Sequence, residues 1–159
     1  MLNIRVICIG KLKEKYWDAA CEEYIKRLGS YCSLEIVELK EDRLPANPSP
    51  ADEQKVIENE GTSILTKIKK SDFVIALDIK GRELSSEGLA ERIENTAFTH
   101  DTIDFIIGGS LGLSGDVKSR ADLALSFGKI TLPHQLARVV LLEQIYRAFK
   151  INAGETYHK

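Results

Sequence analysis

The chain lacks the dense, regularly spaced residues that build zinc or disulfide sites. Its three cysteines, Cys8, Cys21 and Cys32, lie far apart without C-x-x-C spacing, and its three histidines are equally scattered. A disulfide framework or a structural zinc site needs ligands in close, recurring patterns. We therefore expect neither a disulfide nor a metal.

Long apolar runs and a strong charge excess are also missing. No stretch approaches the roughly 18 apolar residues of a membrane span, and the amino-terminal apolar run is too short for a signal peptide. We expect a cytoplasmic protein that does not contact the membrane. The net charge of −2 argues against a broadly basic, nucleic-acid-coating surface. However, residues 129–159 hold five bases against two acids, so a polyanion would bind this part.

Apolar, β-branched runs alternate with helical patterns along the whole chain. The predicted strands are 4–10, 34–39, 73–79, 103–109 and 123–127, and helices are predicted at 16–28, about 50–69, around 114–121 and 133–150. A further helix is predicted after a cap at Ser85 or Ser86, and it carries Leu89, Ile93 and Ala97. Such alternation is typical of an α/β domain with a mostly parallel sheet and helices on both faces. Residues 1–159 fit a single domain.

Three predicted strands end in unusual sequences. The strand 103–109 runs into GGSLGLSG (108–115), and the strand 123–127 runs into FGKITLP (127–133). The strand 73–79 contains Leu77-Asp78 near its end, and Lys80-Gly81-Arg82 is interpreted as the turn that follows. The glycines match neither a dinucleotide fingerprint nor a P-loop. In a parallel sheet these ends meet at one edge, which predicts one ligand pocket.

The last helix carries two polar residues on its apolar side. Pro133 is placed in its first turn, with Thr131 or Leu132 as the cap. Glu143, Arg147 and Lys150 form a predicted solvated edge, whereas His134 and Arg138 share the arc of Leu141 and Ile145. Two interpretations stay open. Either Arg138 extends its charged end to solvent or pairs with a carboxylate while His134 is a hydrogen-bonded core residue, or both form an anion- or nucleotide-binding corner at the helix start.

Two classes of function fit such a domain. A non-catalytic nucleotide-binding or phospho-acceptor regulator would use Asp78, but it would need acidic residues after the first strand, where Lys11 and Lys13 stand instead. A cofactor-binding transferase uses the backbone pocket and the cationic corner together. We favour the transferase.

The segments VICIGKLKEKYW, IGGSLGL, SFGKITLPHQLARVVLLEQIYRAFKI and the terminal YHK resemble the RlmH family, the large-subunit rRNA pseudouridine N3-methyltransferases of the SPOUT superfamily. The resemblance covers essentially the whole chain. It implies a carboxyl-terminal trefoil knot, a homodimer with a site shared across the interface, and methylation of 23S rRNA in assembled ribosomes.

The resemblance also assigns residues. It implies an S-adenosylmethionine site made by Leu77, Gly108, Gly109, Phe127, Gly128, Lys129, Ile130, Thr131 and Leu132. Four residues are expected to act on the target base: Arg138 as a cation that stabilises developing negative charge, His134 as an orienting group or proton acceptor, and Tyr157 and His158 by stacking on the base or closing over it. Lys129, Lys150 and Lys159 are expected to contact phosphate.

Overall fold

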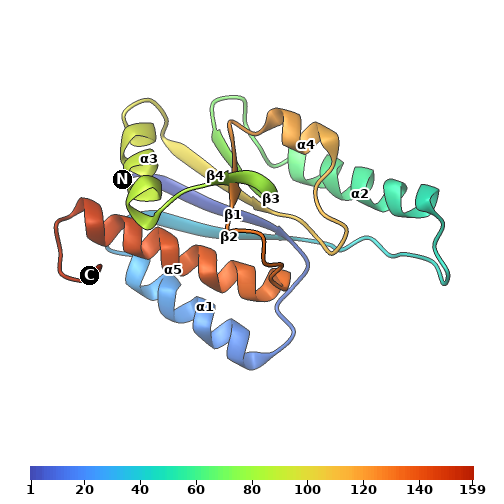
Figure 1. Ribbon diagram of the computed structural model, residues 1–159, viewed down its shortest axis with the longest axis horizontal. Coiled ribbons are helices and arrows are strands. Elements are labelled where there is room, and N and C mark those ends of the chain that lie inside the picture. The colour runs from blue at the N-terminus through green and yellow to red at the C-terminus, as the bar shows by residue number, and fades with distance from the viewer.

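The computed structural model describes residues 1–159 as five strands and five helices in strict alternation (Figure 1). The elements are β1 (Asn3–Ile9), α1 (Lys15–Leu28), β2 (Ser33–Leu39), α2 (Pro50–Leu65), β3 (Phe73–Glu83), α3 (Ser86–Ala97), β4 (Thr102–Ile107), α4 (Gly115–Arg120), β5 (Leu123–Ser126) and α5 (His134–Asn152).

The five strands form one sheet in the order β2-β1-β4-β3-β5, and every pairing is parallel. Figure 1 shows α1 and α5 side by side on one side of the sheet and α2 and α4 on the other. Helix α3 packs against α5. Because both faces are covered, the central strands are buried almost continuously, which is why their sequences are apolar runs rather than alternating patterns. The predicted α/β fold with a parallel sheet is confirmed.

Strand β3 is longer than predicted. It continues to Glu83 past an irregularity between Leu77 and Arg82, and its extension pairs with β5. The predicted turn at Lys80-Gly81-Arg82 is therefore wrong. A Cβ on Gly81 would lie 2.7 Å from the carbonyl of Ala124, so glycine is there because the two strands approach closely, not because the chain reverses.

Two helix boundaries also differ from the predictions. Helix α2 ends at Leu65 rather than at residue 69, because the next residues form short turns such as the bond from Lys67 N to Ile64 O. Helix α5 begins at His134, and Pro133 is its N-cap with an extended ψ of 142° and no side-chain capping bond. The first helical residue is thus the histidine itself, which brings its side chain to the edge of the sheet. The trefoil knot implied by the resemblance stays a prediction.

Candidate functional site

A pocket lies at the carboxyl ends of β3, β4 and β5, beside the start of α5. The empty space at this site is about 700 Å³, which includes open solvent at its mouth. Most of its walls are apolar, and Asp78 and His134 bring titratable side chains to it. The lining residues are Leu77, Asp78, Ile79, Ile107, Gly108, Gly109, Gly112, Leu113, Leu125, Phe127, Gly128, Ile130, Thr131, Leu132, His134 and Ala137.

Glycines open this pocket to a ligand. A Cβ on Gly108 would lie 2.9 Å from Cδ2 of Leu113 and 3.1 Å from the carbonyl carbon of Gly112, so a larger residue would distort the loop. Gly128 has a φ of +108°, a conformation that side chains disfavour. Both positions leave backbone groups at the pocket wall without a covering side chain.

The hydroxyl of Ser126 fixes the loop that follows β5. Its Oγ donates to the carbonyl of Ile79 over 3.0 Å and accepts from the backbone N–H of Gly128 over 3.0 Å. Ser126 is 4% exposed, so these bonds are shielded from water. This one side chain ties the extension of β3 to the loop 127–133, and so joins two of the three pocket walls.

The structure brings together nearly all residues that the resemblance assigned to the cofactor. Eight of the nine line the pocket, and the exception is Lys129, whose side chain is exposed outside the lining. His134 also lines this pocket. The fold therefore brings the three strand ends and the start of the last helix together in one cavity, as predicted.

Arg138 lies beside this pocket rather than in its lining. Its side chain is almost fully buried, and it donates to Oε2 of Glu38 over 2.7 Å and to the carbonyl of Gly10 over 3.2 Å. These partners stand at the carboxyl ends of β2 and β1. The interpretation that Arg138 pairs with a carboxylate is confirmed.

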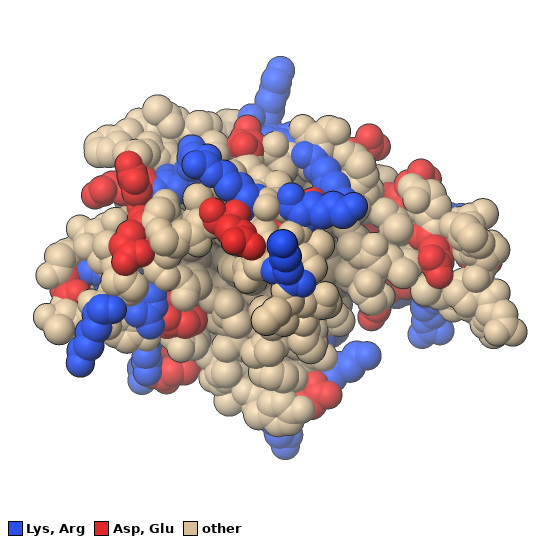
Figure 2. Space-filling view, in the orientation of Figure 1, with Lys and Arg blue, Asp and Glu red and all other residues tan.

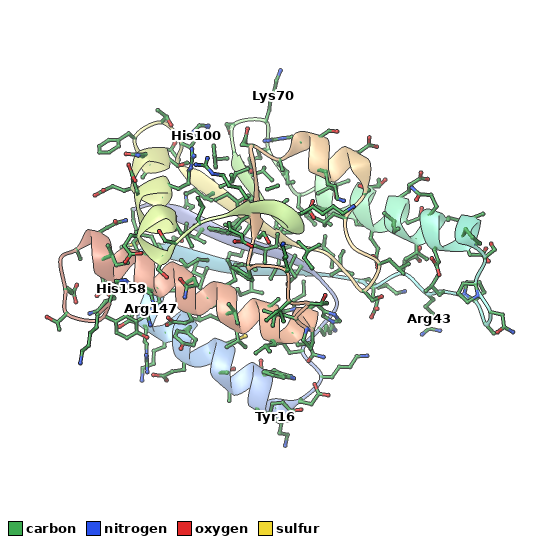
Figure 3. All side chains as sticks on the ribbon, viewed as in Figure 1. Tyr16, Arg43, Lys70, His100, Arg147 and His158 are labelled. Carbon is green, nitrogen blue, oxygen red and sulfur yellow. The ribbon has the colours of Figure 1, made fainter.

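The carboxyl-terminal tail folds back on the far end of α5. Tyr157 donates to Oε2 of Glu143 over 2.8 Å and lies 4.7 Å from the Arg147 guanidinium, while His158 bonds to Arg147 over 3.1 Å and to Glu87 (Figure 3). Thirteen residues of helix separate His134 from Arg147, which is about 20 Å. Tyr157 and His158 are therefore remote from the pocket of their own chain.

The edge formed by Glu143, Arg147 and Lys150 is not solvated, contrary to the prediction. Glu143 and Arg147 make the expected i, i+4 pair over 2.7 Å, but the tail covers them. Lys150 is tied to Glu155 and to the hydroxyl of Tyr31. The reason is that residues 153–159 turn back along the helix, which no periodic pattern within the helix reveals.

Glu60 is a buried carboxylate at the same sheet edge that sequence reasoning missed. It is 5% exposed, its Oε2 accepts from the backbone N–H of Asp42 over 3.1 Å, and its Oε1 has no hydrogen-bond partner. Burial raises the pKa of this carboxyl above its ordinary value. A signal existed in the neighbouring Gly61, since a glycine inside a helix often marks a close approach; here a Cβ would meet Oγ of Ser114 at 2.2 Å.

An apolar, glycine-opened pocket at the carboxyl edge of a parallel sheet defines a cofactor-binding α/β enzyme. A family model described as "Predicted SPOUT methyltransferase" matches residues 2–158, and the chain belongs to this family. It is therefore a methyltransferase.

Particular relatives are close. The chain is 55% identical to the ribosomal RNA large subunit methyltransferase H of Clostridium novyi over 99% of this chain and 100% of the relative. It is 50% identical to the protein of the same name from Oenococcus oeni over 100% of both chains. Among solved structures, a probable methylase family protein from Haemophilus influenzae shares the fold with a TM-score of 0.55 and 13% identity, over 99% of this chain and 71% of that one.

Two further properties of the molecule bear on function. No helix is both long and apolar enough to cross a bilayer. No group of three or more His, Cys, Asp or Glu side chains is placed to hold a metal ion.

Proposed function

We propose that the chain uses S-adenosylmethionine to methylate N3 of a pseudouridine in 23S rRNA, on assembled ribosomes in the cytoplasm. The observation that carries this proposal is the pocket at the ends of β3, β4 and β5, in a chain that belongs to a methyltransferase family. The names of its half-identical relatives support the large-subunit rRNA as the substrate.

The pocket suits the proposed methyl donor. Apolar walls such as Leu77, Phe127 and Leu132 offer packing for an adenosine, and the glycine loops offer backbone N–H and C=O groups for its polar edges. When bound, the donor supplies an electrophilic methyl group on a sulfonium. Leu77, Gly108, Gly109 and residues 127–132 would hold it, with Lys129 contributing its backbone.

The chain must also position the target nitrogen and help to remove its proton. N3 of a pyrimidine ring is weakly acidic and carries a proton that has to leave as the nitrogen attacks. Arg138 lies one helical turn from His134 at the end of β1, where its cation can stabilise developing negative charge on the ring. His134 at the pocket wall orients the base.

We further propose a homodimer in which Tyr157 and His158 serve the partner's pocket. The tail is ordered against α5 by Glu143, Arg147 and Glu87 but lies about 20 Å from its own pocket. An ordered aromatic tail that cannot reach its own site is explained if it reaches another copy's site.

Basic side chains around the pocket mouth support an RNA partner. Lys80 and Arg82 on the extension of β3 and Lys129 after β5 are exposed and make no ion pair, and Lys118 of α4 lies only loosely, at 3.7 Å, from Asp78. Figure 2 shows lysine and arginine side chains gathered over the middle of this face, where β3 and α4 lie. Lys150, expected to bind phosphate, is engaged within the tail instead.

Two measurements test the proposal. Calorimetry with S-adenosylmethionine should show one site per chain, and a Gly108→Val variant should lose it because the side chain would enter the loop at Leu113. Mass spectrometry of 23S rRNA from ribosomes treated with the protein should find one methylated pseudouridine. Methylation of another nucleotide, or none, would contradict the proposed substrate.

A further inference from the structure

A second hollow adjoins the cofactor pocket at the loop after β4. It is lined by Glu41, Asp42, Arg43, Leu44, Val56, Glu60 and Ser110, and so lies between the loop after β2, helix α2 and the glycine loop. Gly109 lines the first pocket and Ser110, the next residue, lines this hollow. The two cavities therefore meet at the backbone of residues 109–110, where Gly109 carries no side chain.

Glu60 reaches that backbone. A Cβ on Gly109 would lie 2.9 Å from Oε1 of Glu60 and 3.4 Å from Oε2, so the carboxylate packs directly on the backbone of the glycine loop. Its Oε2 accepts a hydrogen bond from the backbone N–H of Asp42, whereas Oε1 accepts no hydrogen bond from the protein. Glu60 is 5% exposed as a residue, but its Oε1 is not among the buried atoms that lack a partner, so this oxygen is open at the hollow and a ligand there can donate a hydrogen bond to it.

Arg138 and Glu60 flank the same strand end from opposite faces of the sheet. Arg138 donates to the carbonyl of Gly10, and a Cβ on Gly10 would lie 4.0 Å from Oε2 of Glu41, which lines the hollow. A ligand placed over the end of β1 would thus have a cation on one side and a carboxylate on the other. That is the pair of groups that proton removal from a neutral ring requires.

We propose that the target base lies where this hollow meets the cofactor pocket, over Gly109, and that Oε1 of Glu60 accepts the proton from its N3. The inference rests on the proposed function. A pyrimidine imide presents one N–H donor between two carbonyl acceptors, so a free carboxylate oxygen, in a hollow that Ser110 also lines, complements it. The N3–H bond breaks and its proton moves to Oε1. The nitrogen's electron pair forms the new bond to the methyl group, and the pair of the broken methyl–sulfur bond stays on sulfur.

The charged surroundings of Glu60 favour this role. Glu41, Asp42 and Arg43 face it from the loop after β2, while Gly109 and Ser110 of the loop after β4 and Ile9 of β1 bring no charge. Burial raises the pKa of its carboxyl, the bond from the backbone of Asp42 opposes this, and the charges of Glu41 and Asp42 add to it. A carboxylate with a raised pKa is a stronger base toward a weak acid such as N3–H.

The test compares Glu60→Gln with Glu58→Gln, an exposed neighbour on α2. The glutamine at 60 keeps an acceptor for Asp42 and the shape of the side chain but cannot take a proton. We expect the methyl-transfer rate on unmodified ribosomes to fall at least about 100-fold at pH 7. The residual rate should then rise about tenfold per pH unit as N3 ionises by itself, while Glu58→Gln behaves as wild type.

Three further measurements separate this role from a structural one. Glu60→Asp should retain part of the rate with the wild-type pH profile, and Glu60→Gln should keep its melting temperature and its affinity for S-adenosylmethionine. In carbon-13 spectra of glutamate carboxyl groups, one resonance missing from Glu60→Gln should titrate above the ordinary glutamate range. Full activity of Glu60→Gln, an unchanged pH profile, or loss of cofactor affinity would overturn the inference. Failure of the wild type to methylate ribosomes would instead refute the proposed function.

Discussion

Buried charged groups are paired differently at the two ends of the parallel strands, here called the amino-terminal and the carboxyl edge of the sheet. At the amino-terminal edge, Arg5 donates to both oxygens of Asp104 over 2.8 Å and to Oδ2 of Asp72 over 2.9 Å, and Asp72 also accepts from the backbone N–H of Lys69. At the carboxyl edge, Glu60 has a free oxygen and glycines expose the backbone. The closed network holds strands together, whereas the open carboxylate oxygen and the uncovered backbone at the glycines are groups that a ligand can bind.

The amino-terminal network also fixes the order of the elements. Asp104 belongs to β4, Arg5 to β1 and Asp72 to the turn before β3, so the three charges connect neighbouring strands. Burial raises the pKa of Asp104 to about 6, with Asp72 adding to the rise and Arg5 opposing it. The stability of this network therefore depends on Arg5, its single cation. Substitutions at this edge should lower the stability of the fold, whereas substitutions at the carboxyl edge should lower the rate of methyl transfer.

Replacing that cation should have the largest effect on stability. Arg5→Met leaves two carboxylates that are 0% and 4% exposed without a counter-charge, which should cost about 3–5 kcal/mol of unfolding free energy. The melting temperature should fall by roughly 10 °C or more. The methyl-transfer rate per folded molecule should stay at the wild-type value. Lys70→Met, at an exposed position near the same edge (Figure 3), is the control and should change neither quantity.

The destabilisation by Arg5→Met should shrink at low pH. Without Arg5, the pKa of Asp104 in the folded state rises further above the pKa in the unfolded state. The protonated carboxyl then favours folding at a pH below the unfolded-state pKa. This contribution is lost as the pH rises through the folded-state pKa. Denaturant unfolding at pH 5 and pH 7.5 should therefore differ by about 2 kcal/mol more in the variant than in the wild type. If the unfolding free energy changes equally between the two pH values in the variant and the wild type, groups other than Arg5 balance the charges of Asp104 and Asp72.

At the carboxyl edge, Arg138→Ala should act on chemistry. If its cation stabilises the reacting base, methyl transfer should fall about 100-fold, which is about 2.7 kcal/mol, with cofactor affinity nearly unchanged in calorimetry. Glu38→Gln keeps an acceptor for Arg138 and serves as the matched control, with a loss of less than about fivefold. Similar losses in rate and cofactor affinity for Arg138→Ala would show that the pair with Glu38 only supports the fold.

Removal of residues 157–159 tests whether the tail serves a partner's pocket. The truncated protein should bind S-adenosylmethionine normally but transfer methyl groups at least about tenfold more slowly, because Tyr157 and His158 contribute to base binding. Mixed dimers of truncated chains and Gly108→Val chains should recover part of the activity, since one intact pocket then meets one intact tail. No recovery in stable mixed dimers, or a monomeric mass in light scattering, would reject the shared site.

Charges at the pocket mouth should have the smallest effect. Lys80→Ala and Arg82→Ala together should weaken binding to ribosomes about threefold to tenfold and reduce its dependence on salt, since each removes a phosphate contact. The maximal rate should be unchanged. Lys26→Ala on α1, at an exposed position, is the control. A loss of maximal rate without loss of binding would place these residues in the reaction rather than in docking.

Much of the carboxyl edge could be predicted from the sequence because its signals are local. Apolar runs marked the parallel strands, and the glycine loops after β4 and β5 marked the pocket walls that the fold brings together. The partners of buried charges could not be predicted. Arg138 and Glu38 are 100 residues apart, and Arg5 and Asp104 are 99 apart, so no spacing connects them before the sheet order is known.

Two misinterpretations had the same origin. Gly81 was assigned to a turn because glycine permits one, yet the structure uses it for close contact between β3 and β5. The polar edge of α5 was assigned to solvent because its pattern is that of an exposed face, yet the tail covers it. In both cases a residue's local preference was compatible with two environments, and a distant segment decided between them.

If the amino-terminal end of the sheet serves stability and the carboxyl end serves chemistry, the single-turnover rate of methyl transfer per cofactor-binding molecule should differ between Arg5→Met and Glu60→Gln. Both variants are measured side by side at a temperature where both are folded. We expect a wild-type rate for Arg5→Met and at least a 100-fold loss for Glu60→Gln. Equal rates in the two variants, whether both normal or both reduced, would contradict this expectation.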